Sequence, residues 1–467
     1  MKKINIIIAL LLAGNLVMAQ TSVWHGGREM WTRGEGTEES PFLIESADQL
    51  AMLSYAVNKG YNMPGLYFKL TTDIDLNGSE DQLWTPIGTP YYPEDGCDRK
   101  EKHPEEVCFR GNFDGGGHAI SNIHVDAKNY AGLFGRVYPY DCDTTVLKNI
   151  RIVSGYVSGL FAGGIAGDVE NKVIVSDCYN AAEIHSSSRA GGISGCASFI
   201  ERCYNMGKVS SEGSAGGIAS MGNLGWIKQC YNTGEIIAES EIAGGIVGFS
   251  MKTIEIENCY NTGTVSVLAT DVSRGGCGGI MGCAVADRFS LHNCYNVGSI
   301  NGMDGYTGGV FGGVMRSGIN QDTVSNCYYL NTCGAQGEGI AMDEGAMRAP
   351  GFVDMLNDHT DVWAMDTENH NSGFPILMGL DMGVEELKGT GLAVYPNPTQ
   401  GTLQIESSQI EEIVVFNMLG VMVLQKSAHA LGTTATIDVS SLVDGVYLLR
   451  VVDAQHGYQT CPFVVRH

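Results

Sequence analysis

One repeat unit of the chain reads Gly191-Gly-Ile-Ser-Gly-Cys-Ala-Ser-Phe-Ile-Glu-Arg-Cys-Tyr-Asn-Met-Gly-Lys-Val209. It joins a glycine pair before an aliphatic residue to a Cys-Tyr-Asn triplet, and both motifs recur along the middle of the chain. Steps of 25, 27, 29, 35 and 33 residues separate six Cys-Tyr pairs. The pairs are Cys178-Tyr179, Cys203-Tyr204, Cys230-Tyr231, Cys259-Tyr260, Cys294-Tyr295 and Cys327-Tyr328.

Aliphatic residues stand at fixed positions around each cysteine. Three residues before it come Val175, Ile200, Ile227, Ile256, Leu291 and Val324, and six after it come Ile184, Val209, Ile236, Val265 and Ile300. The glycine motif lies between the Cys-Tyr pairs. Its copies begin at Gly163, Gly191, Gly216, Gly244, Gly278 and Gly308, with a degenerate earlier copy at Ala131-Gly-Leu-Phe-Gly135. Each unit therefore holds two or three short strands between glycine turns.

A unit of this size cannot bury its apolar face alone, so it must stack on its neighbours. Strand signals at a period of 25 to 35 residues predict an all-β fold, a parallel β-solenoid whose coils lie about 4.8 Å apart. Equivalent residues then form ladders. The aliphatic residue at −3 and the cysteine have opposite parity, so a corner or bulge must separate them, and the sequence leaves open whether Cys or Tyr faces inward.

The repeat resembles the GLUG motif of bacterial surface proteins, over about Gly132 to Asn331. Residues 41–125 resemble the segment that often precedes such repeats. There Ser46 and Gln49 predict a capping box, and the following apolar face predicts a helix that caps the open solenoid end. We expect Phe352, Leu356, Trp363 and residues 374–377 to cap the other end.

The last ~75 residues lose glycine and gain β-branched alternation, which predicts a small Ig-like β-sandwich. This tail, from about Leu392 to His467, resembles the C-terminal sorting domain of type IX secretion substrates of Gram-negative bacteria. The residues of the motif are Tyr395, Pro396, Asn397, Pro398, Gly401, Gly420, Gly445 and Tyr447. The resemblance implies two partners, the type IX secretion machinery and the surface protease that removes the tail. It also implies that the protein is then anchored at the outer cell surface or released.

The N-terminus has the three parts of a signal peptide: Lys2 and Lys3, an apolar run, and a small-residue site for cleavage between Ala19 and Gln20. It predicts export through the periplasm. No other run is long enough for a transmembrane helix. We therefore expect a signal peptide (1–19), N-terminal cap and first coils (20–130), GLUG-repeat solenoid (131–345), C-terminal cap (346–380), linker (381–391) and sorting domain (392–467).

Composition restricts the partners. The 28 Lys and Arg against 52 Asp and Glu give a net charge of −24, which repels phosphate backbones and argues against nucleic-acid binding. Hydrophobic residues make up 44% of the chain, which is enough for a large core and argues against disorder. The 63 glycines follow no Gly-X-Y period, so the chain is not collagen-like.

The sequence shows no constellation of catalytic residues. It lacks His-Glu-x-x-His, Gly-x-Ser-x-Gly and phosphate-binding glycine loops, and basic residues are sparse in the repeats. Asp73 with Asp75, and Asp141 with Asp143, lack the further oxygen ligands of a calcium loop. We therefore expect no catalytic site, no metal and no cofactor. The leading hypothesis is an adhesin-like protein that binds host or glycan ligands; the alternatives are a glycan-active β-helix enzyme and a purely structural stalk.

Three sets of candidate residues follow. The tyrosines Tyr179, Tyr204, Tyr231, Tyr260 and Tyr295 form either an exposed binding stripe or a packed corner. The longest gap between triplets contains Asp271 and Arg274, in a loop that is either a contact site or a tolerated insertion. Cys97 and Cys108 flank a charged loop and are the candidate disulfide, whereas we expect the triplet cysteines to be buried and unbridged.

Overall fold

The computed structural model describes the chain outside residues 1–20, 90–106, 140–143, 170–171, 270–275, 286–287, 304, 314–322, 359, 381–392, 396–398, 400, 418–421, 444, 453–457 and 467. Two compact units, Met1–Leu380 and Asp381–His467, make up the chain, and each is described by itself. Within the described residues, no helix is long and apolar enough to cross a membrane.

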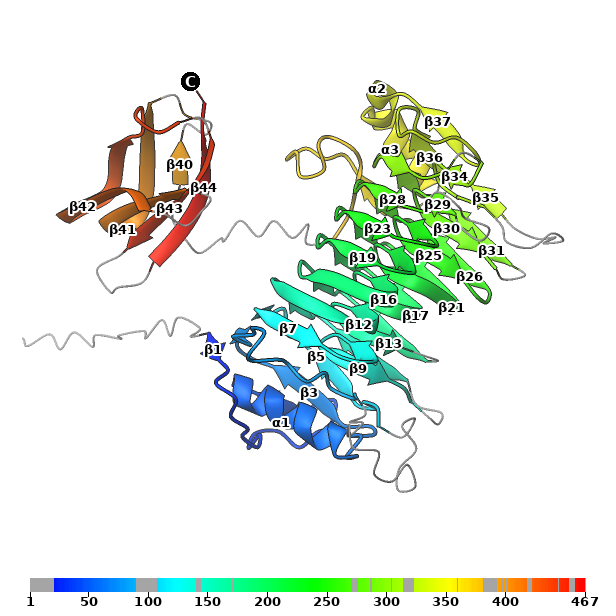
Figure 1. The fold of residues 1–467 in the computed structure, drawn as a ribbon, viewed down its shortest axis with the longest axis horizontal. Helices are drawn as coiled ribbons and strands as arrows, with labels where there is room; N and C mark the ends of the chain where they lie inside the picture. Colours follow the sequence, from blue (N-terminus) through cyan, green and yellow to red (C-terminus); the bar gives the residue numbers. More distant parts are fainter. Residues whose placement is uncertain are drawn as a thin grey trace, which may run out of the picture. The chain divides into compact units, whose positions relative to one another are not determined.

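The first unit is the predicted parallel β-solenoid, with strands stacked from β3 at its blue end to β36 at its yellow end (Figure 1). Three sheets, which we call A, B and C, form its sides, and every pairing between their strands is parallel among the described residues. Sheet A contains β1 (Ser22–Val23), β4 (Ile74–Asp75), β6 (Ala119–Ser121), β11 (Arg151–Ile152), β15 (Tyr179–Asn180), β18 (Tyr204–Asn205), β22 (Tyr231–Asn232), β27 (Tyr260–Asn261), β32 (Tyr295–Asn296), β36 (Tyr328–Leu330) and β37 (Ile340–Met342).

Sheets B and C complete the coils. Sheet B contains β2 (Phe42–Ile44), β3 (Tyr67–Leu70), β5 (Asn112–Asp114), β9 (Phe134–Val137), β10 (Thr145–Lys148), β13 (Ala166–Val169), β14 (Val173–Ser176), β17 (Ser194–Glu201), β21 (Ala219–Lys228), β25 (Val247–Ser250), β26 (Ile254–Glu257), β30 (Met281–Ala284), β31 (Phe289–His292) and β35 (Thr323–Ser325). Sheet C contains β7 (Ile123–Asp126), β8 (Tyr130–Ala131), β12 (Gly155–Gly163), β16 (Glu183–Gly191), β19 (Val209–Ser211), β20 (Ser214–Gly216), β23 (Ile236–Ala238), β24 (Ala243–Gly244), β28 (Val265–Val267), β29 (Cys277–Gly278), β33 (Ile300–Asn301) and β34 (Thr307–Gly308).

The chain turns from sheet B into sheet A between the aliphatic residue at −3 and the cysteine. This is the interval in which the parity of these two residues required a corner. The residue before each triplet cysteine has a positive φ, between 47° and 54°. These residues are Asp177, Arg202, Gln229, Asn258, Asn293 and Asn326. Asn and Asp tolerate this left-handed conformation better than other side chains, which explains their frequency here. The turn resets the alternation between the aliphatic residue at −3 and the cysteine, so both point into the coil.

The buried side chains show whether the cysteine or the tyrosine of each triplet faces inward. The triplet cysteines belong to the solenoid core, and the asparagine that follows each of the first five tyrosines is fully buried inside the coil. Adjacent residues of a strand point to opposite faces, so the tyrosines point outward. They are nevertheless buried, because neighbouring rings stack on one another and other parts of the chain cover them.

Helix α1 (Ala47–Asn58) lies at the N-terminal end of the solenoid (Figure 1). The Ser46 hydroxyl accepts a hydrogen bond from the Gln49 amide, and the Gln49 side chain accepts one from the backbone N–H of Glu45. The predicted capping box is therefore present. The Gln49 side chain accepts from the backbone N–H of Glu45, the residue before the N-cap, where the usual capping box uses the N–H of the N-cap itself. Leu50, Leu53 and Val57 are fully buried in the solenoid core.

The segment expected to cap the other end covers the outward tyrosines. It contains α2 (Glu344–Met347), α3 (Pro350–Asn357), β38 (Trp363–Ala364) and β39 (Ile376–Leu377). The Phe352 ring contacts the rings of Tyr295 and Tyr328, and the Trp363 ring contacts those of Tyr260 and Tyr295. These contacts lie along the flank of sheet A, whereas the sequence suggested a cover over the end. The outward rings leave an apolar surface there that the segment buries.

The second unit is an antiparallel sheet of five strands. It contains β40 (Ala393–Tyr395), β41 (Thr402–Asn417), β42 (Met422–Asp438), β43 (Gly445–Val452) and β44 (Tyr458–Val465). The register between the two long strands β41 and β42 shifts near Ile410, which lets both strands bend. Residues such as Leu403, Val415 and Leu449 bury one face of this sheet in a core of its own.

Candidate functional site

The outer face of sheet B carries a continuous array of outward side chains that the register defines. Residues of one parity, such as Phe68, Leu147 and Ile227, point into the solenoid core and are buried. Residues of the other parity point outward, and two columns of them run along the strands that precede the triplet cysteines. The apolar column runs Tyr67, Asn112, Val146, Ile174, Phe199 and Trp226, and then continues as Glu255, Ser290 and Thr323. The charge column runs Lys69, Asp114, Lys148, Ser176, Glu201, Lys228, Glu257, His292 and Ser325.

The middle of the apolar column is exposed enough to be contacted. Val146, Ile174, Phe199 and Trp226 are all half-buried on four successive coils. The rings of Phe199 and Trp226 meet edge to face with centroids 5.4 Å apart, an arrangement that aromatic pairs favour. Leu224, just before this part of β21, is 57% exposed. Contiguous apolar side chains at the surface of a sheet are typical of contact sites.

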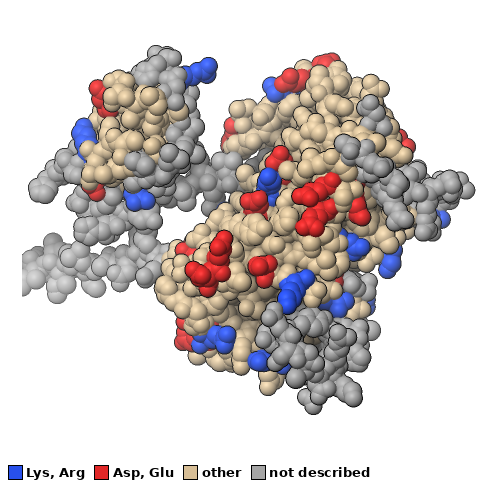
Figure 2. Space-filling view, in the orientation of Figure 1, with Lys and Arg blue, Asp and Glu red and all other residues tan. Residues whose placement is uncertain are grey.

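The charged side chains of the charge column alternate in sign, and neighbours of opposite charge pair with each other. Lys148 Nζ lies 3.9 Å from Asp114 Oδ2, and Lys228 Nζ lies 2.8 Å from Glu257 Oε2 and 3.2 Å from Glu255 Oε1. Partial burial by itself would lower the pKa of Lys228, but the hydrogen bonds to both glutamates outweigh it and raise this pKa. Figure 2 shows acidic and basic groups spread over a surface that is mostly neither on the face in view. Such a face attracts neither polyanions nor polycations strongly.

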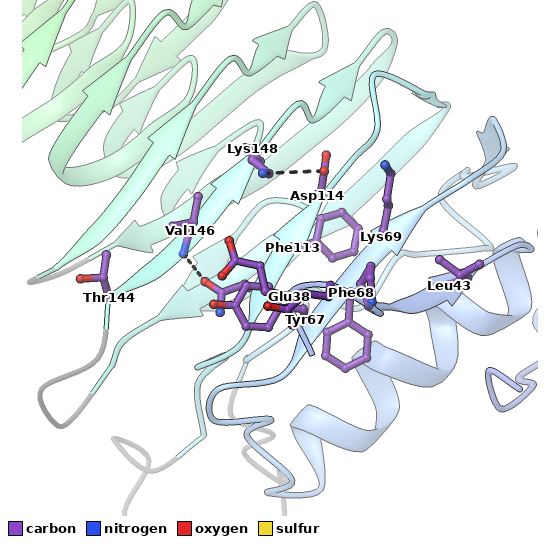
Figure 3. A pocket seen from close by; sticks show the side chains of 13 residues that line it. Glu38, Leu43, Tyr67, Phe68, Lys69, Phe113, Asp114, Thr144, Val146 and Lys148 are labelled. Atoms are coloured by element: carbon purple, nitrogen blue, oxygen red, sulfur yellow. Dashed lines mark hydrogen bonds and ion pairs between the residues drawn. The ribbon is translucent and has the colours of Figure 1, made fainter. Parts of the chain in front are cut away.

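A groove of about 550 Å³ lies over the N-terminal end of this face (Figure 3). Tyr67, Asn112 and Val146 contribute from the apolar column, and Lys69, Asp114 and Lys148 from the charge column. Glu38 and Glu39 line it from the segment that precedes β2. The groove therefore combines an aromatic ring, amide and charged groups in a volume suited to a small or extended ligand.

The carboxylates of Glu38, Glu39 and Asp114 line the groove, but that of Asp114 is held by hydrogen bonds within the fold. Asp114 Oδ1 accepts hydrogen bonds from the Gly116 backbone N–H and from Asn149 Nδ2, both at 2.9 Å. It therefore stabilises the corner after β5. Within the described residues, no group of three or more His, Cys, Asp or Glu side chains is placed to hold a metal ion. The groove has the features of a binding site.

The structure contradicts the exposed tyrosine stripe that the sequence left possible. Tyr179, Tyr204, Tyr231, Tyr260 and Tyr295 are between 0% and 8% exposed. Successive ring centroids lie 4.7 to 5.1 Å apart and the rings are stacked, so each ring face is covered by the next. The Tyr295 hydroxyl donates to Pro375 O and accepts from Asn371 Nδ2. Burial raises the pKa of both Tyr260 and Tyr295.

The remaining candidates are only partly described. Asp271 and Arg274 of the long loop, Ala19 and Gln20 of the cleavage site, and Cys97 all lie outside the described residues. Cys108 is buried and carries no disulfide to a described residue, and burial raises the pKa of its thiol. The predicted burial of the triplet cysteines is confirmed, and these six residues are unbridged in the structure.

Some residues of the sorting motif are described. Tyr395 ends β40, Gly401 directly precedes β41 and Gly445 begins β43. Tyr447 is buried, and its hydroxyl donates to Val443 O at 2.8 Å. Pro396, Asn397, Pro398 and Gly420 lie outside the described residues.

The two columns of sheet B were not predicted from the sequence, although the sequence contains a signal for them. Ile174, Phe199 and Trp226 each stand four residues before a triplet cysteine, and Ser176, Glu201 and Lys228 stand two residues before it. Both positions have the opposite parity to the buried aliphatic residue at −3, so they must point outward from the same strand.

Two family descriptions match parts of the chain. Residues 393–465 match the "Secretion system C-terminal sorting domain", and residues 239–266 match "The GLUG motif". The chain therefore carries a type IX sorting domain and a GLUG-type repeat, as its sequence suggested. The sorting domain indicates export to the cell surface or the extracellular space.

Known proteins resemble parts of the chain. "Halomucin" of Haloquadratum walsbyi is 27% identical over 165 residues, which are 35% of this chain and 2% of halomucin. A "Putative Gly-rich membrane protein" of Evansella cellulosilytica is 28% identical over 151 residues, which are 31% of this chain and 15% of that protein. The matched part is thus a small fraction of both relatives. A crystal structure described as a "putative immunoglobulin A1 protease" from Bacteroides ovatus covers 74% of this chain and 94% of its own, with 21% identity and a TM-score of 0.45.

Proposed function

We propose that this chain is a non-catalytic, adhesin-like surface protein that binds its ligands through the outer face of sheet B. The observation that carries the proposal is the uninterrupted apolar column from Val146 to Trp226, half-buried and bordered by self-neutralised charges. A host protein or a glycan would contact the rings and aliphatic side chains and hydrogen-bond to the charge column. Because the sheet is held by backbone hydrogen bonds between coils, these groups are positioned before the ligand arrives.

The proposed route to the surface follows from both ends of the chain. A signal peptide is cleaved between Ala19 and Gln20, and the secretion machinery recognises the folded tail. The surface protease then removes residues 392–467, and the solenoid remains anchored or is released. In this arrangement residues 20–130 form the N-terminal cap and first coils, and 131–345 the repeat. Residues 346–380 form the C-terminal cover and 381–391 the linker.

A glycan-active enzyme is the second candidate, because Glu38 and Glu39 line a groove together with Asp114. Its chemistry would need two of these carboxylates free to act as acid and base. Asp114 is tied by two hydrogen bonds, which leaves the neighbouring glutamates as the pair. Loss of glycan turnover in a Glu38→Gln or Glu39→Gln variant would support the enzyme.

The test is a glycan and host-matrix binding array with the mature secreted protein and its variants. Trp226→Ala and Phe199→Ala should each abolish or strongly weaken binding, since aromatic side chains dominate contact energies. Met206→Ala is the matched control, because Met206 is 41% exposed but follows the strand of sheet A. Binding that survives both substitutions on sheet B would rule out this face, and absence of any ligand would favour the structural stalk.

A further inference from the structure

We infer that the outer face of sheet B recognises a second copy of this chain, turned antiparallel about a twofold axis that passes by Ser176. The inference rests on the proposed function, since it names the partner of the same face. Its basis is the order of charges along the charge column. From Lys69 to Glu257 the signs read plus, minus, plus, neutral, minus, plus and minus, with Ser176 in the centre.

A twofold axis parallel to the strands keeps the charge column opposite the charge column and reverses the order of coils. Every charge then meets its opposite. Lys148 faces Glu201 of the second copy, Asp114 faces Lys228, and Lys69 faces Glu257. Each contact occurs twice, as a twofold interface requires. Six complementary pairs would fix the register and exclude shifted alignments, because a shift by one coil brings like charges together.

The centre of the apolar column is complementary under the same operation. Ile174 meets its own copy and Val146 meets Phe199, whereas farther out Asn112 meets Trp226 and Tyr67 meets Glu255. The groove over Tyr67, Asn112 and Val146 receives the edge-to-face pair of Phe199 and Trp226, which lies just beyond the centre on the second copy. Apolar groups thus lie at the centre and polar groups toward both ends, as in specific interfaces.

A parallel pairing does not have this complementarity. A twofold axis along the solenoid would place the charge column either on itself or on the apolar column. The first alternative brings Lys148 against Lys148, and the second buries charges against Val146 and Ile174. Both alternatives cost free energy because charges lose water without gaining a partner.

The size and direction of the contact suit a surface protein. Seven coils at about 4.8 Å span about 30 Å, which places the contact among small, weak interfaces. The net charge of −24 also opposes pairing at low salt. Many copies on facing surfaces would compensate through avidity.

Molecules attached to two cells through their C-terminal ends meet antiparallel, so the inferred pair would join cell to cell.

The experiment uses charge reversal in the full chain, with association measured by sedimentation over a concentration series. Lys148→Glu alone and Glu201→Lys alone each place like charges at both symmetric contacts. We expect each variant to associate at least tenfold more weakly than the wild type. An equimolar mixture of the two variants restores opposite charges at every contact, so it should form a heterodimer with wild-type affinity.

Lys208→Glu is the matched control, because Lys208 pairs with Glu235 beside sheet C and lies outside the interface. It should associate like the wild type. Rescue by mixing cannot come from repaired folding, since each chain keeps its own substitution. A wild type that stays monomeric, a Lys148→Glu variant that still pairs, or a mixture without rescue would each overturn the inference. Array binding that depends on Trp226 would in that case still support the proposed function.

Discussion

Each asparagine of the first five triplets is fully buried and links one coil to the next. Asn205 Nδ2 donates to Asn232 Oδ1 at 2.8 Å, and Asn232 Nδ2 donates to Asn261 Oδ1 at the same distance. The same Asn232 Nδ2 also donates to Gly234 O. The ladder therefore satisfies polar groups that water cannot reach, and it runs in one direction through the interior.

Replacing Asn232 by alanine should destabilise the solenoid by about 2–4 kcal/mol, because one buried N–H of Asn205 loses its acceptor and Asn261 Oδ1 loses its donor, while Asn205 Nδ2 keeps its bond to Gly207 O. Urea denaturation followed by circular dichroism measures this loss. Thr233→Ala at the neighbouring exposed position is the control and should change the unfolding free energy by less than about 0.5 kcal/mol. Equal effects of both substitutions would contradict a structural role for the ladder.

Buried thiols make the stability depend on alkaline pH. Burial raises the pKa of Cys277 to about 12, and it raises the pKa of Cys203, Cys259 and Cys294 as well. The folded chain then keeps thiol protons that the unfolded chain releases above about pH 8.5. The thiol contribution to stability is complete below that pH and is lost as the pH rises toward 12.

Between pH 8 and pH 10, Cys277 alone should account for a loss of about 2 kcal/mol in unfolding free energy. Urea denaturation of the wild type and of Cys277→Ala at both pH values tests this. The variant is less stable at pH 8 because of its cavity, but its free energy should fall less between the two pH values. A parallel fall in both proteins would show that this thiol titrates normally in the fold.

At the scale of elements, the two halves of the repeat depend on each other. The glycine pairs lie where sheet C turns into sheet B, and the second glycine of a pair packs on the asparagine ladder. A Cβ atom on Gly217 would lie 2.0 Å from Gly245 O and 2.6 Å from Asn232 Cγ. Backbone cannot move aside there without separating the coils. The glycine and the asparagine therefore recur together because they touch in space.

Gly217→Ala should destabilise the solenoid by about 3 kcal/mol or more, since the new methyl group meets backbone on the next coil. Thermal unfolding followed by circular dichroism measures the shift. Gly351→Ala in α3 is the control, because a Cβ atom there meets nothing within 4 Å. It should be neutral or stabilise by up to about 1 kcal/mol through helix propensity. A tolerated Gly217→Ala would show that the coils can separate.

Trp363 is one of the large side chains that hold the C-terminal segment to sheet A. Trp363 is 2% exposed, its ring contacts those of Tyr260 and Tyr295, and its indole N–H donates to Asn258 Oδ1 at 3.0 Å. Because this contact joins residues about a hundred positions apart, it couples the segment to the middle of the solenoid.

Trp363→Ala should cost about 3–5 kcal/mol and expose the two tyrosines that the ring covers. Chemical nitration followed by peptide mapping should show Tyr260 and Tyr295 becoming reactive. Met355→Ala, on α3 at a side chain that is 42% exposed, is the control and should leave both tyrosines protected. Protection that persists in the Trp363 variant would mean that other groups cover the rings.

At the scale of the whole molecule, two units with separate cores make up the chain. The solenoid core and the core of the tail share no residue among those described. The tail therefore should not be needed to fold the solenoid, and its role should be transport.

Deleting residues 392–467 should leave the melting temperature of the solenoid unchanged within error and keep the protein in the periplasm. Calorimetry of the purified variant and cell fractionation measure the two outcomes. Surface display of the truncated chain would contradict the transport role, and a lowered melting temperature would show that the tail supports the solenoid.

The sequence determined the architecture, because the forces behind it are local or repeated. A period of 25 to 35 residues with strand signals requires stacked coils, since no unit can bury its own apolar face. The capping box of α1 forms between residues four apart or fewer, so Ser46 and Gln49 predicted it directly. The tail could be predicted as a separate antiparallel unit for the same reason, from its own alternation.

Only the tertiary structure decided which side chains reach the surface. Parity required a corner before each cysteine, but only the left-handed residue there shows that the cysteine, and not the tyrosine, faces inward. Burial of the tyrosines depends on Phe352 and Trp363, which the chain brings from far away. Phe199 and Trp226 are neighbours because their coils stack in register, although 26 residues lie between them in the sequence. Contacts between distant residues are set by packing in three dimensions, and a linear pattern does not contain them.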